Sequence, residues 1–271
     1  MARIITITNN KGGTGKTATA VNLAAALRLH GLDVLIIDYD GQANTSDTLR
    51  APAVGGTIYD AMRDPATPYI EPARILAPDR ATGAGVLDVV PSCSDLSAVE
   101  VELSNQPDRV TRFAAVVGKY RDKYDVVIID TPPTLGLLSI SALYAADELI
   151  IPTQPQYLAI RGLVALSDVI ATVSANRETL PFQGGPLPSR VLFTQYDKRK
   201  GLHRLAVEQV RAVLPAFITM IRDNVALGEA PAVGVDIFRY APKSNGAKDY
   251  DALAAEYLKG AKLRHVKHGY K

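Results

Sequence analysis

A glycine-rich loop with two lysines, N-N-K-G-G-T-G-K-T at residues 9–17, has the residue types and spacing of a phosphate-binding site. In such a loop, backbone N–H groups surround phosphate oxygens at the start of a helix, where the helix dipole also favours anions. Lys16 would then reach the β- and γ-phosphates of a nucleotide, and the Thr17 hydroxyl would bind Mg²⁺. The common pattern G-x-x-x-x-G-K-[ST] is not met, because Asn10 occupies the position of its first glycine. The loop therefore predicts a nucleotide site of an unusual type.

Three aspartates follow apolar segments that are typical of buried strands. Asp38 and Asp40 end L-I-I-D-Y-D, and Asp130 ends V-V-I-I-D. Because side chains alternate along an extended chain, Asp38 and Asp40 lie on the same side. One of them can support Mg²⁺ through water while the other positions an attacking water. Asp130 has the Walker B arrangement, which holds Mg²⁺ or its water near a γ-phosphate.

The elements that must position these residues are short β-branched segments alternating with amphipathic ones, as in βαβ units. Expected strands are Ile4–Thr8, Val34–Ile37, Val86–Val90, Val126–Ile129, Glu148–Ile151, Val191–Phe193 and Phe217–Ile221. Expected helices are Lys16–Leu29, Arg109–Tyr120, Leu137–Ala145, Ala159–Ala175, His203–Val213 and Ala247–Leu258. This order predicts one α/β domain with a single doubly wound, mostly parallel sheet. Ligands of such sheets bind beyond the carboxyl ends of the strands, so the loop and the aspartates should meet there.

Together, the motifs resemble those of the ParA/MinD superfamily of ATPases, and in particular its ParA/Soj type. K-G-G-x-G-K-T is similar to the deviant phosphate loop (deviant Walker A) of that superfamily, D-x-D-x-Q-x-N to its second motif, and D-T-P-P to the D-x-P-P of ParA proteins. The resemblance implies a Rossmann-like, deviant P-loop NTPase domain over residues 1–258 and a basic tail over 259–271. It also implies ATP and Mg²⁺ as cofactors. Gly41 stands where the ParA branch usually has proline, which predicts a looser turn after Asp40.

The resemblance further implies roles for individual residues. Lys11 would cross the interface of an ATP-sandwich homodimer to the partner's phosphates, acting with Lys16 in catalysis, while Asp40 would orient the hydrolytic water. The residues expected to hold Mg²⁺ are Thr17, Asp38 and Asp130. The residues expected to bind the nucleotide are Lys11, Gly12, Gly13, Thr14, Gly15, Lys16, Thr17, Tyr196, Arg222 and Asn224.

The carboxyl-terminal half matches the family less completely. Gln154 falls on the glutamine of a P-x-Q stretch, and Tyr196 lies in a segment that frames the nucleotide base in relatives. Residues 221–231 resemble a stretch that ends in L-x-E-A-P. Three positions in that stretch depart from the residues common in relatives: Arg222, Asp223 and Ala226.

The formal net charge of +2, from 30 Lys and Arg against 28 Asp and Glu, conceals an uneven distribution. Residues 1–135 carry −3 and residues 136–271 carry +5, an asymmetry found in proteins that contact nucleic acid or membranes. Non-specific DNA binding needs little more than cations facing phosphates. The resemblance implies a DNA-contacting basic residue near Arg199. The cluster expected to bind DNA is Lys198, Arg199, Lys200 and Arg204, with simple solvation of these cations as the alternative.

Composition also excludes several classes of protein. A single cysteine, Cys93, excludes a disulfide framework, a thiolate zinc site and a self-contained iron–sulfur cluster. The sequence begins without a signal-peptide core, and its apolar runs fall far short of the roughly 20 residues that span a bilayer. We therefore expect a cytoplasmic, nucleoid-associated protein with no membrane contact.

Two functions are compatible with the motifs. The first is a Mg²⁺-dependent partition ATPase that dimerises on ATP, binds DNA non-specifically, and is released when a ParB-like centromere-binding or cargo-adaptor protein stimulates its slow hydrolysis. The alternative is a MinD-like membrane-associated regulator with the same nucleotide chemistry. That role requires a carboxyl-terminal amphipathic helix. The tail offers only Leu263, Val266 and Tyr270 among its cations, which favours partition.

Overall fold

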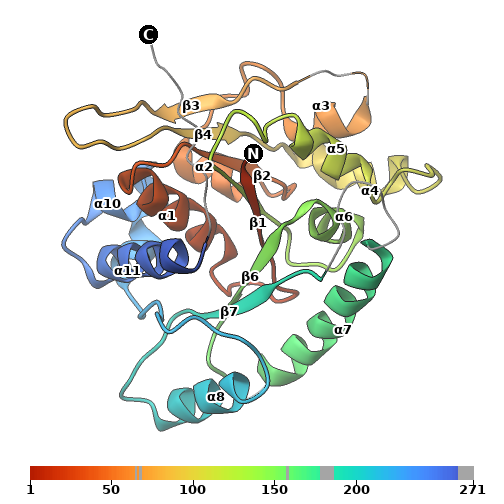
Figure 1. Cartoon of the computed structure of the whole chain (residues 1–271). Coiled ribbons are helices and arrows are strands. Elements are labelled where there is room, and N and C mark those ends of the chain that lie inside the picture. Colours follow the sequence, from red (N-terminus) through yellow and green to blue (C-terminus); the bar gives the residue numbers. More distant parts are fainter. Residues whose placement is uncertain (65, 67–68, 157–158, 178–185, 262–271) are drawn as a thin grey trace.

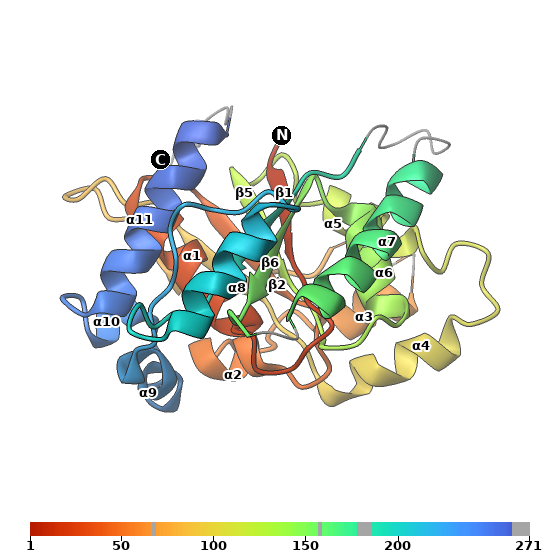
Figure 2. The same ribbon diagram turned by 90° about the horizontal axis from the view of Figure 1, so that it is seen from below.

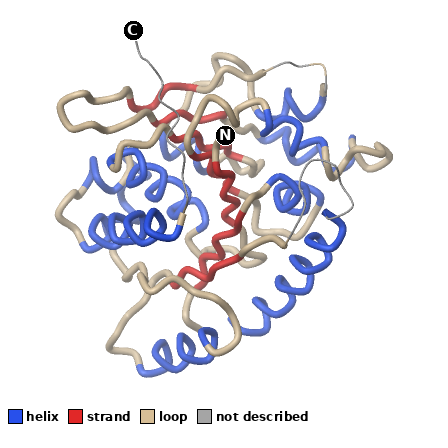
Figure 3. The backbone as a smooth tube through the Cα atoms, in the orientation of Figure 1, coloured by secondary structure: helices blue, strands red, loops and turns tan. Residues whose placement is uncertain are grey.

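The computed structural model describes residues 1–64, 66, 69–156, 159–177 and 186–261. Within these residues one sheet has the strand order β3-β4-β2-β5-β1-β6-β7, and every neighbouring pair is parallel except β3 with β4. The expected α/β class with a mostly parallel, doubly wound sheet is confirmed (Figure 3). The strands are β1 (Arg3–Ile7), β2 (Val34–Asp38), β3 (Ala73–Leu76), β4 (Leu87–Val90), β5 (Val126–Asp130), β6 (Glu148–Thr153) and β7 (Ser189–Phe193).

Helices cover both faces of the sheet. On one face lie α1, α10 and α11, on the other lie α3, α4, α5 and α6, and α7 and α8 follow around the β6–β7 edge (Figure 1). None of the helices in the described part of the chain is long and apolar enough to cross a membrane. The helices are α1 (Lys16–Leu29), α2 (Asn44–Leu49), α3 (Ile58–Arg63), the 3₁₀ helix η1 (Ser94–Ala98), α4 (Val99–Glu102), α5 (Arg112–Gly118), α6 (Leu137–Ala145), α7 (Ala159–Arg177), α8 (Gly201–Arg211), α9 (Val225–Val233), α10 (Ile237–Tyr240) and α11 (Asn245–Gly260).

The central strands are apolar on both faces because helices cover both. Every residue of β2, β5 and β6 is buried. Successive side chains enter different cores: Ile128 packs in the cluster with α1 and α11, and Ile129 in the cluster with α3 to α6. This accounts for the nearly uninterrupted hydrophobic runs of the sequence, which are typical of parallel strands covered on both sides.

The connections from β1 and β5 leave in opposite directions and so define the switch point of the sheet. The chain passes from β1 through α1 to β2 on one side, and from β5 through α6 to β6 on the other. Strands β1 and β5 are neighbours, and Ile7 pairs with Asp130 at their carboxyl ends. A crevice beyond these ends is the expected ligand site of an open α/β sheet.

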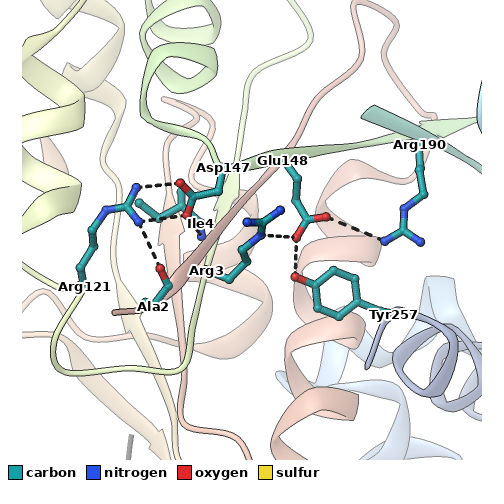
Figure 4. Close-up of polar contacts among 8 residues, drawn as sticks. All are labelled: Ala2, Arg3, Ile4, Arg121, Asp147, Glu148, Arg190 and Tyr257. Atoms are coloured by element: carbon teal, nitrogen blue, oxygen red, sulfur yellow. Dashed lines mark hydrogen bonds and ion pairs between the residues drawn. The ribbon is translucent and has the colours of Figure 1, made fainter. Parts of the chain in front are cut away.

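The opposite, amino-terminal edge of the sheet is held by a charged cluster around Glu148 (Figure 4). Its Oε1 accepts hydrogen bonds from Arg3 Nε at 3.0 Å and from the Tyr257 hydroxyl at 2.5 Å. Arg190 approaches its Oε2 at 3.8 Å and stacks over the ring of Phe217, 4.0 Å from the centroid. These contacts connect α11 to β1, β6 and β7 at the edge of the sheet opposite the phosphate loop.

A second pair beside it fixes the start of β1. Asp147 accepts two hydrogen bonds from the Arg121 guanidinium, each of 3.0 Å, and one from the Ile4 N–H at 2.8 Å (Figure 4). Arg121 also donates to the carbonyl of Ala2 at 3.2 Å. A bidentate arginine–carboxylate pair has a defined geometry, so it sets the position of the strand that leads into the loop.

The expected strand at Phe217–Ile221 is wrong. This segment is flanked by two isolated bridges, Val191 with Ala216 and Tyr196 with Arg222, and its own bonds to β7 are those of the Phe217 and Ile221 N–H groups with the carbonyls of Val191 and Phe193. Its other backbone groups are bound by side chains: Arg211 donates to the carbonyls of Phe217 and Ile218, and Glu256 accepts from the N–H groups of Ile218 and Thr219. Side-chain partners thus replace the ladder that a strand would need.

The seventh strand is instead β3, an antiparallel edge strand that the sequence did not indicate because its residues are only partly buried. The short helices α2, α3, η1, α4, α9 and α10 were also not expected. The helix expected at Arg109–Tyr120 is shorter, and that expected at His203–Val213 begins two residues earlier. The helix expected at Leu137–Ala145 has those bounds.

Candidate functional site

The glycine-rich loop connects the end of β1 to the start of α1, at the switch point of the sheet. Gly13 and Gly15 have φ angles of 70° and 86°, which glycine adopts without steric cost. Gly15 precedes α1 and provides no side-chain cap, so the first N–H groups of the helix remain available to an anion. An open cleft of about 350 Å³ lies beside the loop. Its lining residues are Gly12, Gly13, Gly15, Lys16, Thr17, Ala18, Asp40, Gln42, Asn44 and Pro133.

Asn9 fixes the entrance of the loop. Its amide Nδ2 donates to the carbonyl of Pro152 at 2.7 Å, and its Oδ1 accepts the N–H of Lys11 at 3.1 Å. The side chain is buried and therefore connects the loop to the end of β6 through satisfied polar groups.

The far side of the loop is held from the ends of β6 and β7. The amides of Gln154 and Gln195 both donate to the carbonyl of Gly13, at 2.8 and 3.1 Å, and the hydroxyl of Thr194 donates to the carbonyl of Thr14 at 2.8 Å. Gln154 was noted in the sequence as part of a P-x-Q stretch. The contacts of Thr194 and Gln195 were not predicted, since no local pattern indicates that β7 reaches the loop.

The two lysines of the loop have different surroundings. Lys16 is buried, its ammonium donates to the carbonyl of Lys11 at 3.0 Å, and burial lowers its pKa against the opposing effect of Asp130 and Asp40. The Lys11 side chain approaches α7, where its Cε lies 3.4 Å from the position of a Cβ on Gly162. Lys16 therefore lies near the acids of its own chain, whereas the Lys11 side chain lies beside Gly162 of α7.

The three aspartates meet at the carboxyl ends of β2 and β5. Asp38 and Asp130 are directly paired in the parallel register of these strands, and both are fully buried. The backbone N–H of Asp40 approaches Asp38 Oδ1 at 3.4 Å, and the Asp40 side chain lines the cleft with Lys16 and Thr17. The sequence prediction that the loop and these carboxylates meet is confirmed.

Burial changes the acidity of the two paired carboxyls. It raises the pKa of Asp38 to about 7, and the neighbouring charge of Asp130 adds to this. Burial likewise raises the pKa of Asp130 to about 6, although hydrogen bonds from Thr17 and Thr45 act in the opposite direction. Two such acids close together favour a cation between or beside them.

The donor set fits a magnesium ion that also binds phosphate. Asp130 Oδ1 is buried and has no hydrogen-bond partner in the described part of the chain, so it is an oxygen whose natural partner is a metal or its water. Thr17 lines the cleft and lowers the pKa of the Asp130 carboxyl, so its hydroxyl oxygen is available to a metal beside that carboxyl. Among the described residues, His, Cys, Asp and Glu nowhere gather in groups of three that could hold an ion by themselves. Mg²⁺ is usually bound in this way, by one or two protein ligands plus substrate phosphates.

Helix α2 contributes two hydroxyl residues that the sequence analysis missed. Thr45 Oγ1 donates to Asp130 Oδ2 at 2.8 Å, and Ser46 donates to Asp38 Oδ2 from its N–H at 2.8 Å and its hydroxyl at 2.6 Å. Their only sequence signal was their place directly after the D-x-D motif.

Tyr39, the residue between the first two aspartates, anchors the motif on the other face of the sheet. Its ring stacks on Phe113 with centroids 3.7 Å apart, and its hydroxyl hydrogen-bonds to Ser141 at 3.1 Å. Gly41 does not give the looser turn expected from the sequence, because a Cβ there would overlap the Ser97 side chain. The motif is therefore closely packed against η1.

Comparison with known proteins is consistent with this geometry. A family model described as an AAA domain matches residues 2–181. The chain is 36% identical to the chromosome-partitioning ATPase Soj of Treponema pallidum, over 95% of this chain and 98% of that protein. It is 37% identical to the sporulation initiation inhibitor protein Soj of Bacillus subtilis, over 94% and 98%. The chain belongs to the ParA/Soj family.

Solved structures show the same fold. Cobyrinic acid a,c-diamide synthase from Mycobacterium smegmatis, crystallised with ADP and magnesium, superposes with a TM-score of 0.77 at 26% identity, covering 99% of this chain and 100% of that one. As a member of the ParA/Soj family, the chain is a P-loop ATPase with a partition role.

The segments expected to surround the base in this ParA/Soj chain lie side by side, since Tyr196 and Arg222 form a parallel bridge. The Arg222 guanidinium is bound to Asp249, with a shortest distance of 2.6 Å, and this pair raises the pKa of Arg222. Asn224 caps α9 by accepting the N–H of Ala226 at 2.9 Å. Both side chains therefore already have partners within the chain.

The basic cluster lies in the loop between β7 and α8 and at the start of α8. Lys198, Arg199, Lys200 and Arg204 are all exposed. Arg199 forms an ion pair with Asp197 at 2.9 Å, and this neighbour holds the pKa of the Asp197 carboxyl well below its usual range. Part of the Arg199 charge is thus offset locally. Residues 262–271 of the basic tail, including Leu263, Val266 and Tyr270, lie outside the described residues.

The raised pKa of Asp130 predicts a conflict between stability and function. Because its folded pKa of about 6 exceeds the unfolded value, its contribution to stability is present below about pH 4 and is lost as the pH rises through 6. Asp130→Asn should therefore raise the free energy of unfolding of the nucleotide-free chain by on the order of 1–3 kcal/mol at pH 8, and change it little at pH 4. The same variant should lose metal-supported hydrolysis.

Urea unfolding at the two pH values checks this expectation. The exposed Asp122→Asn is the matched control and should change stability at neither pH. An Asp130→Asn chain that is less stable than the parent at pH 8 would contradict the assigned cost of burying this carboxylate.

Proposed function

We propose that this chain is an ATP-dependent partition ATPase that forms an ATP-sandwich dimer, binds DNA non-specifically, and leaves DNA after hydrolysis. The observation that carries the proposal is the meeting of the glycine-rich loop, its Lys16 and three carboxylates at one end of the sheet. Lys16 lies near these acids, and the side chain of the second lysine, Lys11, lies beside Gly162 of α7. This arrangement supports one nucleotide site per chain, which Lys11 of a second chain would complete.

The nucleotide site is built from the loop and the start of α1. Backbone N–H groups of the loop, from Gly12 to Thr17, would surround the phosphates, and Lys16 would move from the Lys11 carbonyl to the β- and γ-phosphate oxygens. Mg²⁺ would be held by Thr17, Asp38 and Asp130, directly or through water. When bound, the ion supplies positive charge that stabilises the negative charge of the transferring phosphoryl group.

Hydrolysis requires a positioned water and a further positive charge. Asp40 lines the cleft and would accept a proton or hydrogen bond from the attacking water, aligning it with the γ-phosphate. Lys11 of the second chain would contact the phosphates in trans, as an arginine finger does in other P-loop enzymes. Hydrolysis would then depend on the positioning of the water and on positive charge near the phosphates. Such a site is consistent with slow intrinsic hydrolysis that an adaptor protein accelerates.

DNA binding is assigned to the basic half of the chain. Lys198, Lys200 and Arg204 are exposed, whereas Arg199 shares its charge with Asp197. A dimer doubles the number of such cations that face one duplex, so its affinity would rise steeply while the monomer, with a net charge of +2, binds weakly. This supports a nucleoid-associated dimer that carries DNA or another cargo through a ParB-like adaptor.

Co-sedimentation with DNA tests the proposal. The parent chain should pellet with duplex DNA in the presence of ATP and remain in solution with ADP, and binding should fall steeply with salt. A triple variant with Lys198, Lys200 and Arg204 changed to alanine should lose binding, whereas the exposed Lys243→Ala should retain it. Equal binding to DNA with ATP and with ADP would contradict the proposal that ATP controls DNA binding. Binding to anionic liposomes rather than DNA would favour the MinD-like alternative.

A further inference from the structure

Helix α2 lies at the carboxyl ends of β2 and β5 and beside α9 (Figure 2). It is only six residues long, and both of its flanking residues, Ala43 and Arg50, have left-handed φ angles of 53° and 50°. Such angles are unfavourable for residues other than glycine and persist where the surrounding structure requires them. At the carboxyl end of α2, the Arg50 side chain packs so closely on Gly234 that a Cβ atom on Gly234 would overlap the Arg50 side chain. The helix is therefore held in a fixed place.

The first hydroxyl of α2 acts on the acid at the end of β5. Thr45 is fully buried and donates to Asp130 Oδ2 at 2.8 Å, while Asp130 Oδ1 has no hydrogen-bond partner among the described residues. One carboxylate oxygen is thus occupied by the helix and the other is left over. A metal ion or its bound water needs a carboxylate oxygen that is not already hydrogen-bonded.

The second hydroxyl acts in the same way on the acid at the end of β2. Ser46 gives two hydrogen bonds to Asp38 Oδ2, of 2.6 and 2.8 Å, while within the described parts of the chain Asp38 Oδ1 receives only the N–H of Asp40 at 3.4 Å. The Ser46 hydroxyl itself accepts the N–H of Ser92 at 3.0 Å, so its orientation is fixed from the end of β4. Thr45 and Ser46, which are consecutive in the sequence, therefore each hydrogen-bond to one oxygen of one of two neighbouring carboxylates.

We propose that Thr45 and Ser46 are positioning residues that orient Asp130 and Asp38 for Mg²⁺, each occupying one carboxylate oxygen and leaving the other for the ion or its water. Outer hydrogen bonds of this kind fix ligand orientation, and their loss costs about 10- to 100-fold in metal affinity. The inference rests on the proposed function only in that this site binds Mg²⁺ with ATP. It does not depend on dimerisation or DNA binding.

The test is the magnesium dependence of nucleotide binding by the full-length chain. The affinity for a non-hydrolysable ATP analogue is measured in EDTA and across a Mg²⁺ titration for the parent, Thr45→Val, Thr45→Ser and Thr48→Val. Thr45→Val retains the shape but lacks the hydroxyl, so its half-maximal Mg²⁺ concentration should rise about 10-fold or more while its affinity in EDTA stays near the parent's. Thr45→Ser should stay within about 3-fold of the parent.

Thr48→Val is the matched control, because Thr48 is buried on the same helix and hydrogen-bonds to neither carboxylate among the described contacts. It should leave the Mg²⁺ midpoint unchanged. Ser46→Ala keeps the backbone donor to Asp38 and should therefore shift the midpoint less than Thr45→Val does.

The outcomes separate this inference from the broader proposal. A Thr45→Val chain with the parent's Mg²⁺ midpoint, or a Thr45→Ser chain shifted equally far, would overturn the positioning role. A parent whose nucleotide affinity ignores Mg²⁺ would overturn the metal assignment as well. Failure of ATP-dependent DNA binding would refute the partition cycle and leave the Thr45 result standing.

Discussion

Asp40→Ala is expected to reduce ATP hydrolysis by about 100-fold or more, the scale of a lost general base, while ATP binding and dimerisation persist. Asp40 lines the cleft beside Lys16 and Thr17, and its Oδ1 is held by the N–H of Gln42 at 3.0 Å. Its carboxylate is therefore fixed where it can align a water, and it is not needed to hold the loop. The ATP-loaded dimer should accumulate on DNA.

Single-turnover hydrolysis and DNA retention after removal of free ATP measure the two effects. Asp47→Ala, which removes an exposed acid of α2, is the matched control and should hydrolyse ATP at the parent rate. If Asp40→Ala hydrolysed ATP as fast as the parent, the role assigned to Asp40 would be wrong.

Lys11→Ala is expected to abolish ATP-dependent dimerisation and to reduce hydrolysis by about 1000-fold, the lower end of the effect of an arginine finger. The Lys11 side chain lies beside Gly162 of α7, whereas Lys16 lies near Asp130 and Asp40 and is proposed to bind the phosphates of its own chain. Loss of Lys11 should therefore leave ATP binding by the single chain nearly intact. Lys16→Ala, in contrast, should lose ATP binding.

Light scattering with a non-hydrolysable ATP analogue measures the oligomeric state. The parent should reach twice its 29.0 kDa mass and Lys11→Ala should not. The exposed Lys243→Ala, which removes a lysine far from the loop in the sequence, should dimerise like the parent. A Lys11→Ala chain that dimerises normally would show that this lysine does not join the two chains.

The features of the fold that follow from local pattern were predictable. Strands β2 and β5 are apolar at almost every position because helices cover both faces, and each ends in the aspartate that the sequence singled out. Strand β3 was missed because it lies at the edge and is only partly buried. The error at Phe217–Ile221 arose because an apolar run says nothing of distant side chains such as Glu256, which bind its backbone.

The same limit applies to the site. The loop and the three aspartates carry their chemistry in residue type and spacing, so the sequence was enough to place them together. The roles of Thr45, Ser46 and Thr194 depend on tertiary contacts with partners 8 to 180 residues away, for which no local pattern exists. Gly41 was misinterpreted for a similar reason, because its neighbour Ser97 is distant in sequence.

Mixing two inactive variants tests the central claim most directly, namely that each site is completed by a lysine from a second chain. Lys11→Ala keeps Asp40, and Asp40→Ala keeps Lys11, so only a mixed dimer contains one site with both residues. The account predicts that each variant alone hydrolyses ATP very slowly and that their equimolar mixture recovers hydrolysis that saturates with protein concentration. The mixed dimer keeps one Lys11, and light scattering with a non-hydrolysable ATP analogue measures whether it forms. A mixture that forms this dimer and is no more active than the two variants measured separately would show that Lys11 acts within its own chain, and would contradict the ATP-sandwich dimer.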